Sequence, residues 1–153
     1  MNKSQVGFTL IELIVVIVIL GILAATALPR MANLSGDARF AVMKGAEGSM
    51  RAANSLIYAR AASLSIQSAA AGVIPANTMG NTVAINTVFG FAGSVTDLTA
   101  MMDLSPAADF TIAALTLQHA RANTPANCQI TYTVATATAV PTYVNNGTAT
   151  ACS

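Results

Sequence analysis

The stretch GFTLIELIVVIVILGILAATALP, residues Gly7 to Pro29, is almost unbroken hydrocarbon and contains one carboxylate, that of Glu12. As a helix, residues 8–28 would reach about 30 Å, which matches the hydrocarbon core of a bilayer. The stretch therefore predicts a transmembrane helix. The presence of the carboxylate requires an explanation. Inserting an ionised acid into a membrane costs about 2.5 to 3.5 kcal/mol of free energy at the bilayer centre and less near the end of the helix.

Two plain interpretations of this stretch are an anchor helix and a secretory signal peptide. The small residues Ala25-Thr26-Ala27 resemble a signal-peptidase cleavage site. What distinguishes this sequence from both is its leader, MNKSQVG, which is short and polar, contains Lys3 and ends in Gly7 directly before FTLIEL.

Composition limits the functional classes. The chain has 153 residues, enough for one domain beside the apolar segment, and its formal net charge is +1. Charged residues make up 8% of it, against about 25% in an ordinary soluble domain, so no specific nucleic-acid partner is expected. His119 is the only histidine and is expected on the surface or in a sheet. No enzyme motif, cofactor or metal site is predicted; calcium bound by Asp97, Asp103 and Asp109 is the alternative considered.

After the apolar segment, the sequence predicts an amphipathic helix over residues 29–72 that continues the first. Apolar residues recur at steps of three and four, and the pattern ends near Gly72, with Pro75 beyond it. The residues of this stripe are Met43, Ala46, Met50, Ala53, Ile57 and Leu64.

Residues 73–153 are expected to form a globular head. DFTIAALTLQ and CQITYTVAT are typical of strands, and AVPTYV is expected at an edge because Pro141 forbids a central position. Ser94 and Asp97 are suited to cap a short helix through Met102. The predicted fold class is α+β: a long N-terminal helix, half transmembrane and half amphipathic, packed on a small antiparallel sheet.

GFTLIEL resembles the prepilin-type cleavage and methylation motif of the type IV filament subunits, which are the type IV pilins and the pseudopilins of type II secretion. The resemblance implies a ladle-shaped pilin fold and a leader of residues 1–7. It implies that a prepilin peptidase cuts between Gly7 and Phe8 and methylates the new Phe8 amine. It also implies storage in the inner membrane of a Gram-negative bacterium, an inner-membrane assembly machinery, and a helical homopolymer on the cell surface.

The resemblance gives Glu12 a partner, because methylation leaves the Phe8 amine charged. Glu12 could meet its own amine, one helical turn away, or that of a neighbour, which would fix the axial register between subunits. Gly21 and Pro29 weaken the helix, and the resemblance implies that the stretch between them loses helicity on assembly. The alternatives are an acid with no role and a plain proline kink.

Cys128 and Cys152 are the only cysteines, and an even count in an exported chain favours one disulfide. Two free thiols in a reducing compartment are the alternative. A C-terminal disulfide loop resembles type IV pilins more than the major pseudopilin. Three segments resemble the mannose-sensitive haemagglutinin branch of the pilins: VFGFAG, MMDL and NCQITYTVATATAVPTYV. This resemblance implies a major pilin.

The expected function is therefore a structural pilus subunit for adhesion, with motility and a carbohydrate receptor on a host or other surface as further candidates. The alternatives are a type II secretion pseudopilin and a periplasmic binding protein with a signal peptide. One observation opposes export of the head. Three cations, Arg30, Arg39 and Lys44, follow the apolar segment, so the positive-inside rule favours a cytoplasmic location for the C-terminal side. The paired cysteines and the Thr-rich, charge-poor head favour export.

Overall fold

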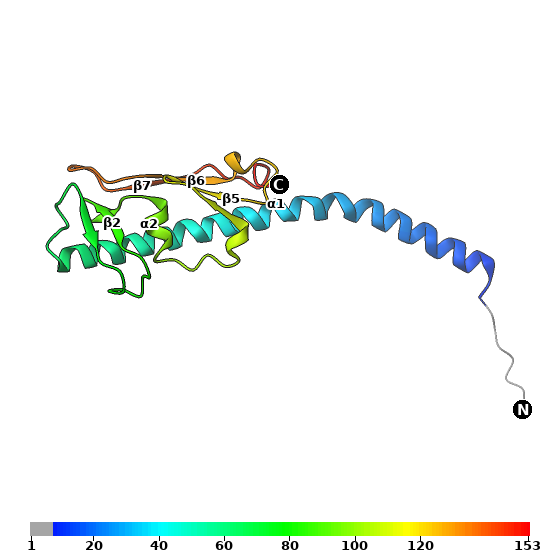
Figure 1. The fold of residues 1–153 in the computed structure, drawn as a ribbon. Coiled ribbons are helices and arrows are strands. Elements are labelled where there is room, and N and C mark those ends of the chain that lie inside the picture. Colours follow the sequence, from blue (N-terminus) through cyan, green and yellow to red (C-terminus); the bar gives the residue numbers. More distant parts are fainter. Residues whose placement is uncertain (1–7) are drawn as a thin grey trace, which may run out of the picture.

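The computed structural model describes residues 8–153, except the side chains of residues 29–33. The predicted leader, residues 1–7, lies outside this range. One long helix, α1 (Leu10–Ser63), runs through most of the length of the molecule, and the head covers only its C-terminal half (Figure 1). The remaining elements gather on that half, which gives the ladle shape that the resemblance implies.

Helix α1 has 54 residues and is about 80 Å long at the usual rise per residue. Its backbone stays helical through positions 21 and 29, so the predicted boundary at residue 28 falls inside one continuous helix. The N-terminal half curves away from the axis of the half that carries the head (Figure 1).

Helix α1 ends at Ser63, well before Gly72, where the sequence predicted its end. The reason is a Schellman motif: Ile66 N–H donates to the Ala61 carbonyl at 2.9 Å and Ser65 N–H to the Ala62 carbonyl at 3.0 Å. Ser65 takes the left-handed conformation, with φ of 58°. Glycine usually fills this position, so the motif left no recognisable signal in the sequence.

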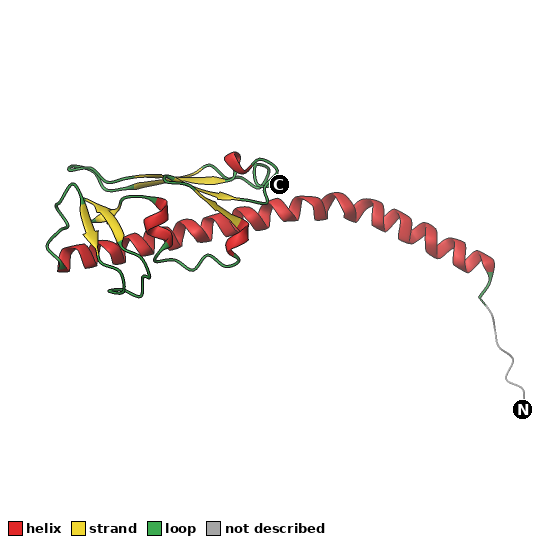
Figure 2. Cartoon of the chain, viewed as in Figure 1, coloured by secondary structure: helices red, strands yellow, loops and turns green. Residues whose placement is uncertain are grey.

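The head contains two antiparallel sheets. The first has the order β1-β2-β3, with β1 (Gly72–Ile74), β2 (Ile85–Val88) and β3 (Phe91–Ala92). The second has the order β4-β5-β6-β7, with β4 (Phe110–Ile112), β5 (Thr116–His119), β6 (Gln129–Thr133) and β7 (Thr142–Asn145). The short helices are α2 (Val95–Thr99), η1 (Ala107–Asp109) and η2 (Pro125–Asn127). The α+β prediction is confirmed, with two sheets instead of one (Figure 2).

Several local predictions hold with shifted bounds. β7 begins directly after Pro141 and forms an edge of the second sheet. Ser94 caps α2, since its hydroxyl accepts from Asp97 N–H at 3.1 Å, but the helix ends at Thr99 instead of Met102.

The core lies between α1 and the two sheets. Most of the predicted stripe is buried, with exposed fractions of 0 to 6%: Met43, Ala46, Met50, Ala53 and Ile57. Leu64 is 36% exposed, so its inclusion was wrong; Ala61 continues the stripe instead, because Leu64 already lies beyond the helix end. Leu117, Ile130 and Tyr132 face this stripe from the second sheet.

One buried polar group, Asn54, joins all three layers. Its Nδ2 donates to the hydroxyls of Tyr132 at 3.0 Å and Tyr143 at 2.7 Å, and its Oδ1 accepts from Ala92 N–H at 2.9 Å. The Tyr132 hydroxyl in turn donates to the Ala92 carbonyl at 2.7 Å. Burial raises the pKa of Tyr132 to about 12, so the hydroxyl stays protonated as a donor well into the alkaline range.

We expect Asn54→Ala to lower the free energy of unfolding by about 3 kcal/mol, because the Ala92 amide loses its acceptor in a buried site. Ser55→Ala is the matched control: Ser55 is exposed on the same turn and bonds only the Arg51 carbonyl, so little change is expected. Urea unfolding of both variants in detergent measures the difference. Equal stability of the two variants would contradict a bonding role for this network.

Candidate functional site

The first part of the candidate site is the start of α1. Thr9 is the N-cap, and its hydroxyl accepts from Glu12 N–H at 3.3 Å. The Glu12 carboxylate closes a capping box, since Oε2 accepts from Thr9 N–H at 2.9 Å and from the Thr9 hydroxyl at 2.8 Å. Sequence reasoning missed Thr9, although the T-x-x-E spacing of residues 9–12 is the signal for this box.

Glu12 thus has a partner inside its own chain. Its other oxygen, Oε1, has no hydrogen-bond partner among the groups that the structure describes. Phe8, directly before the N-cap, is 90% exposed. The carboxylate can therefore cap its own helix with one oxygen and accept from an outside donor with the other.

The second part is the apolar stretch of α1 from Leu10 to Leu28, 19 residues with a mean hydropathy of 2.8, none of which is buried in the described structure. Its large apolar side chains are 46 to 74% exposed. The Thr26 hydroxyl donates to the Leu23 carbonyl at 2.9 Å, so this polar group is satisfied inside the helix. By length and composition the stretch can cross a membrane. An apolar helix of this kind requires cover from lipid or from other helices.

The third part is an exposed stripe on the half of α1 that carries the head. Most of its members precede a residue of the buried stripe by one position, and the spacing between members alternates between four and three residues, as in a coiled-coil seam. We call it the outer stripe: Ala38, Val42, Gly45, Ser49, Ala52, Leu56 and Ala59. All are exposed and uncharged, and nothing lies within 4 Å of a side chain built at Gly45. A second helix could therefore approach closely along this stripe.

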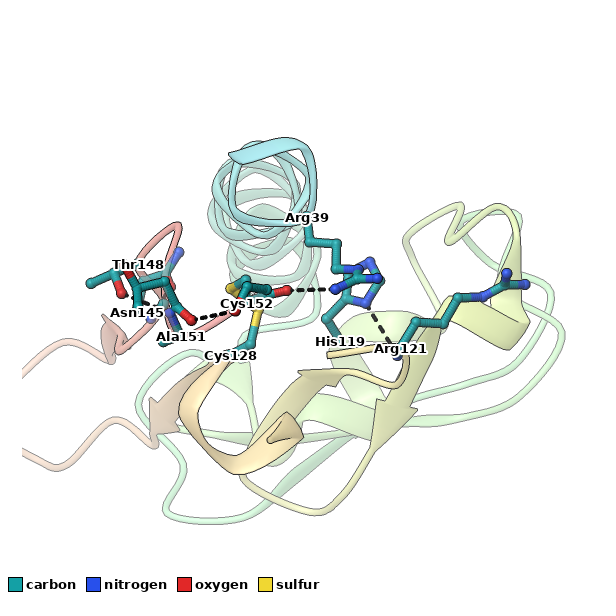
Figure 3. The surroundings of a disulfide bond; sticks show 11 residues. Arg39, His119, Arg121, Cys128, Asn145, Thr148, Ala151 and Cys152 are labelled. Carbon is teal, nitrogen blue, oxygen red and sulfur yellow. Dashed lines mark hydrogen bonds between the residues drawn. A yellow bond between two sulfur atoms is a disulfide. The ribbon is translucent and has the colours of Figure 1, made fainter. Parts of the chain in front are cut away.

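The fourth part ties the C-terminal segment to α1. Cys128 and Cys152 form a disulfide, with Cα atoms 4.9 Å apart and both residues fully buried. Arg39 extends from α1 and its Nη1 donates to the Cys152 carbonyl at 2.9 Å (Figure 3). At Gly36, the backbone of Ala149 comes so close that a side chain would overlap its carbonyl oxygen. We call Gly36, Arg39, Ala149 and Cys152 the C-terminal contact.

Three of the polar residues singled out in the sequence have partners in the structure, and the fourth, Asp103, is exposed. His119 ends β5 and is 4% exposed, in a sheet as expected. Asp97 accepts from Asn86 N–H at 2.8 Å, and Asp109 forms an ion pair with Arg121. Within the described part of the chain, no three acidic, histidine or cysteine residues are grouped closely enough to hold a metal ion.

Residues 2–28 match the family model described as the prokaryotic N-terminal methylation motif. This range contains residues 2–7 of the predicted leader, the candidate cleavage site and the apolar stretch.

Two kinds of curated protein are similar to the chain. It is 50% identical over 44 residues to "Type II secretion system core protein G" of Pseudomonas aeruginosa, which covers 29% of this chain and 31% of that protein. It is 43% identical over 53 residues to "Type IV major fimbrial protein FimA" of Dichelobacter nodosus, which covers 35% and 34%. The chain thus matches about a third of the length of these relatives, and no solved structure matches it.

The motif and the relatives together support the type IV pilin family in the broad sense that includes pseudopilins. Neither relative bears the name of an enzyme.

Proposed function

We propose that this chain is the structural subunit of a type IV pilus. The apolar helix stores it in the inner membrane, a prepilin peptidase cuts between Gly7 and Phe8 and methylates Phe8, and the subunit then joins a surface filament. The observation that carries this proposal is a methylation motif placed on a predominantly apolar helical stretch of 19 residues that the head does not cover.

That helix needs two successive environments. Lipid covers residues 10–28 before assembly, and once the subunit leaves the membrane only other apolar helices can replace the lipid. The outer stripe, on the same helix, offers a further uncharged contact. Because the apolar half and the head are different surfaces, they can form head-to-tail contacts between copies. Such contacts yield an open filament when the rotation between copies does not close into a ring.

Glu12 would set the register in this filament. Its free Oε1 can accept from the methylated Phe8 ammonium of a neighbour, while Oε2 keeps its bonds to Thr9. A buried charge without a partner is costly, so the pair would favour one axial position over others. Cleavage after Gly7 is what creates the ammonium, which ties assembly to processing.

Gly21 and Pro29 would let the helix lengthen on assembly. Each weakens an α-helix, Pro29 because it lacks a backbone donor. The stretch between them lies outside the head, where no other element covers it. Local loss of helicity there would add extensibility without disturbing the core.

The disulfide favours a pilin over a pseudopilin, because the C-terminal disulfide loop resembles the type IV pilins. The mannose-sensitive haemagglutinin branch, adhesion and a carbohydrate receptor remain predictions from resemblance. The second candidate is a pseudopilin, which the 50% identity to core protein G over 44 residues favours.

Intact mass and N-terminal sequencing of the protein from cells test this proposal. We expect a chain that begins at Phe8 and carries one added methyl group, and a peptidase-deficient strain should retain the leader. A start at Leu28 would indicate signal cleavage after Ala27, and a retained leader in normal cells would indicate a plain anchor. Either result would contradict the proposal.

A further inference from the structure

The surroundings of His119 favour its neutral form. It is 4% exposed, and its Nδ1 accepts a hydrogen bond from the Arg121 backbone N–H at 3.3 Å. The neutral ring therefore carries its proton on Nε2. The Phe110 ring faces it, with ring centroids 6.0 Å apart.

Charged groups face this ring from three places: Arg39 on α1, Asp109 on η1, and Arg121 just after β5. Burial is the main cause that lowers the pKa of His119. The Asp109 carboxylate opposes the shift, and the two arginines add to it. Asp109 is already paired with Arg121. A protonated His119 ring would therefore be repelled by two arginines and attracted by one carboxylate, which it would share with Arg121.

Arg39 connects this ring to the C-terminal contact. It extends from α1 past His119, and its Nη1 holds the Cys152 carbonyl (Figure 3). Asp37, the neighbouring acid on α1, is exposed and lines a separate hollow with Ala149, Thr150 and Ser153.

We propose that protonation of His119 loosens the C-terminal contact, so that mild acid weakens the attachment of the C-terminal segment to α1. A proton from solvent would occupy Nδ1 and remove the acceptor of the Arg121 amide. The new charge would repel Arg39, which then leaves the Cys152 carbonyl. The disulfide keeps the segment tethered, so the release is reversible. This inference is independent of whether the chain polymerises.

The direction with pH follows from the lowered pKa. The unfolded chain takes up the proton near the ordinary value of 6.5, before the folded chain does. The stabilisation by neutral His119 is therefore complete above that pH and is lost as the pH falls below it, through the lower pKa of the folded chain. His119 is the only histidine in the chain. A change in stability just below neutral pH can therefore be assigned to its side chain.

Hydrogen exchange of the full chain in detergent micelles, followed by mass spectrometry, tests the proposal. After correction for intrinsic exchange rates, protection of residues 147–153 should fall several-fold between about pH 7.5 and about pH 5.5, while β6 stays protected. His119→Gln keeps an acceptor for the Arg121 amide but cannot titrate, so it should show no such loss. Arg39→Gln keeps a donor to Cys152 without the charge, so its loss should be smaller.

An equal loss of protection in wild type and His119→Gln would overturn the proposal, as would a loss spread evenly over the head. If His119→Gln does not fold, NMR titration of the single histidine ring in the wild type decides. Its protonation midpoint should coincide with the midpoint of the exchange change. Separate midpoints would overturn the proposal.

Discussion

Replacing Glu12 by alanine is expected to leave a membrane-inserted subunit that forms at least about tenfold fewer fibres. Insertion should be unharmed, because removing an acid lowers the cost of placing the helix in lipid. Assembly should fail, because a neighbour's Phe8 ammonium would enter an apolar core without a partner, at a cost of several kcal/mol. The yield of sheared fibres, divided by the subunit level in membranes, measures this effect.

The capping box provides the controls for this experiment. Thr9→Ala removes the box but keeps the carboxylate, at a cost of about 1 kcal/mol in helix stability, so fibres should persist. Glu12→Gln keeps an acceptor for Thr9 N–H without the charge, so fibre yield should be intermediate. If Thr9→Ala fails as completely as Glu12→Ala, Glu12 acts through its own helix and the register mechanism is wrong.

Gly36→Ala is expected to destabilise the folded head by about 2 kcal/mol, although alanine is the better helix former. The added methyl group would overlap the Ala149 carbonyl oxygen and lie 3.1 Å from its carbon and 3.2 Å from the Ser153 Cα. All three are backbone atoms, so the C-terminal segment must shift, and with it the bond from Arg39.

Gly48→Ala is the matched control, because nothing lies within 4 Å of the added methyl group on the same helix. It should raise the free energy of unfolding by up to about 1 kcal/mol. Urea unfolding of both variants in detergent, with the disulfide intact, gives the comparison. Stabilisation of both variants to the same extent would show that the C-terminal segment does not press on α1.

Local patterns predicted much of this fold. The apolar run, the buried stripe from Met43 to Ile57 and the edge position after Pro141 each depend on residues close together in the chain. The helix end was missed because Ser65 takes the left-handed position that glycine usually fills. Leu64 fitted the helical period, but the helix stops just before it.

The C-terminal contact could not be predicted, because it joins residues more than 100 positions apart. Arg39 and Cys152 are 113 residues apart, and nothing in either neighbourhood indicates the other. Glycine ordinarily weakens a helix, but at Gly36 the missing side chain leaves room for the backbone of Ala149. Asn54 likewise acquires its role from residues that follow it by 38, 78 and 89 positions.

The most direct test of the filament proposal is to shear surface fibres from cells with and without this chain and to identify their main component. We predict fibres built mainly of this protein, beginning at methylated Phe8, and their absence from the strain that lacks it. Unchanged fibres in that strain, or a chain that stays in the membrane while protein secretion fails in its absence, would contradict its role as a pilus subunit.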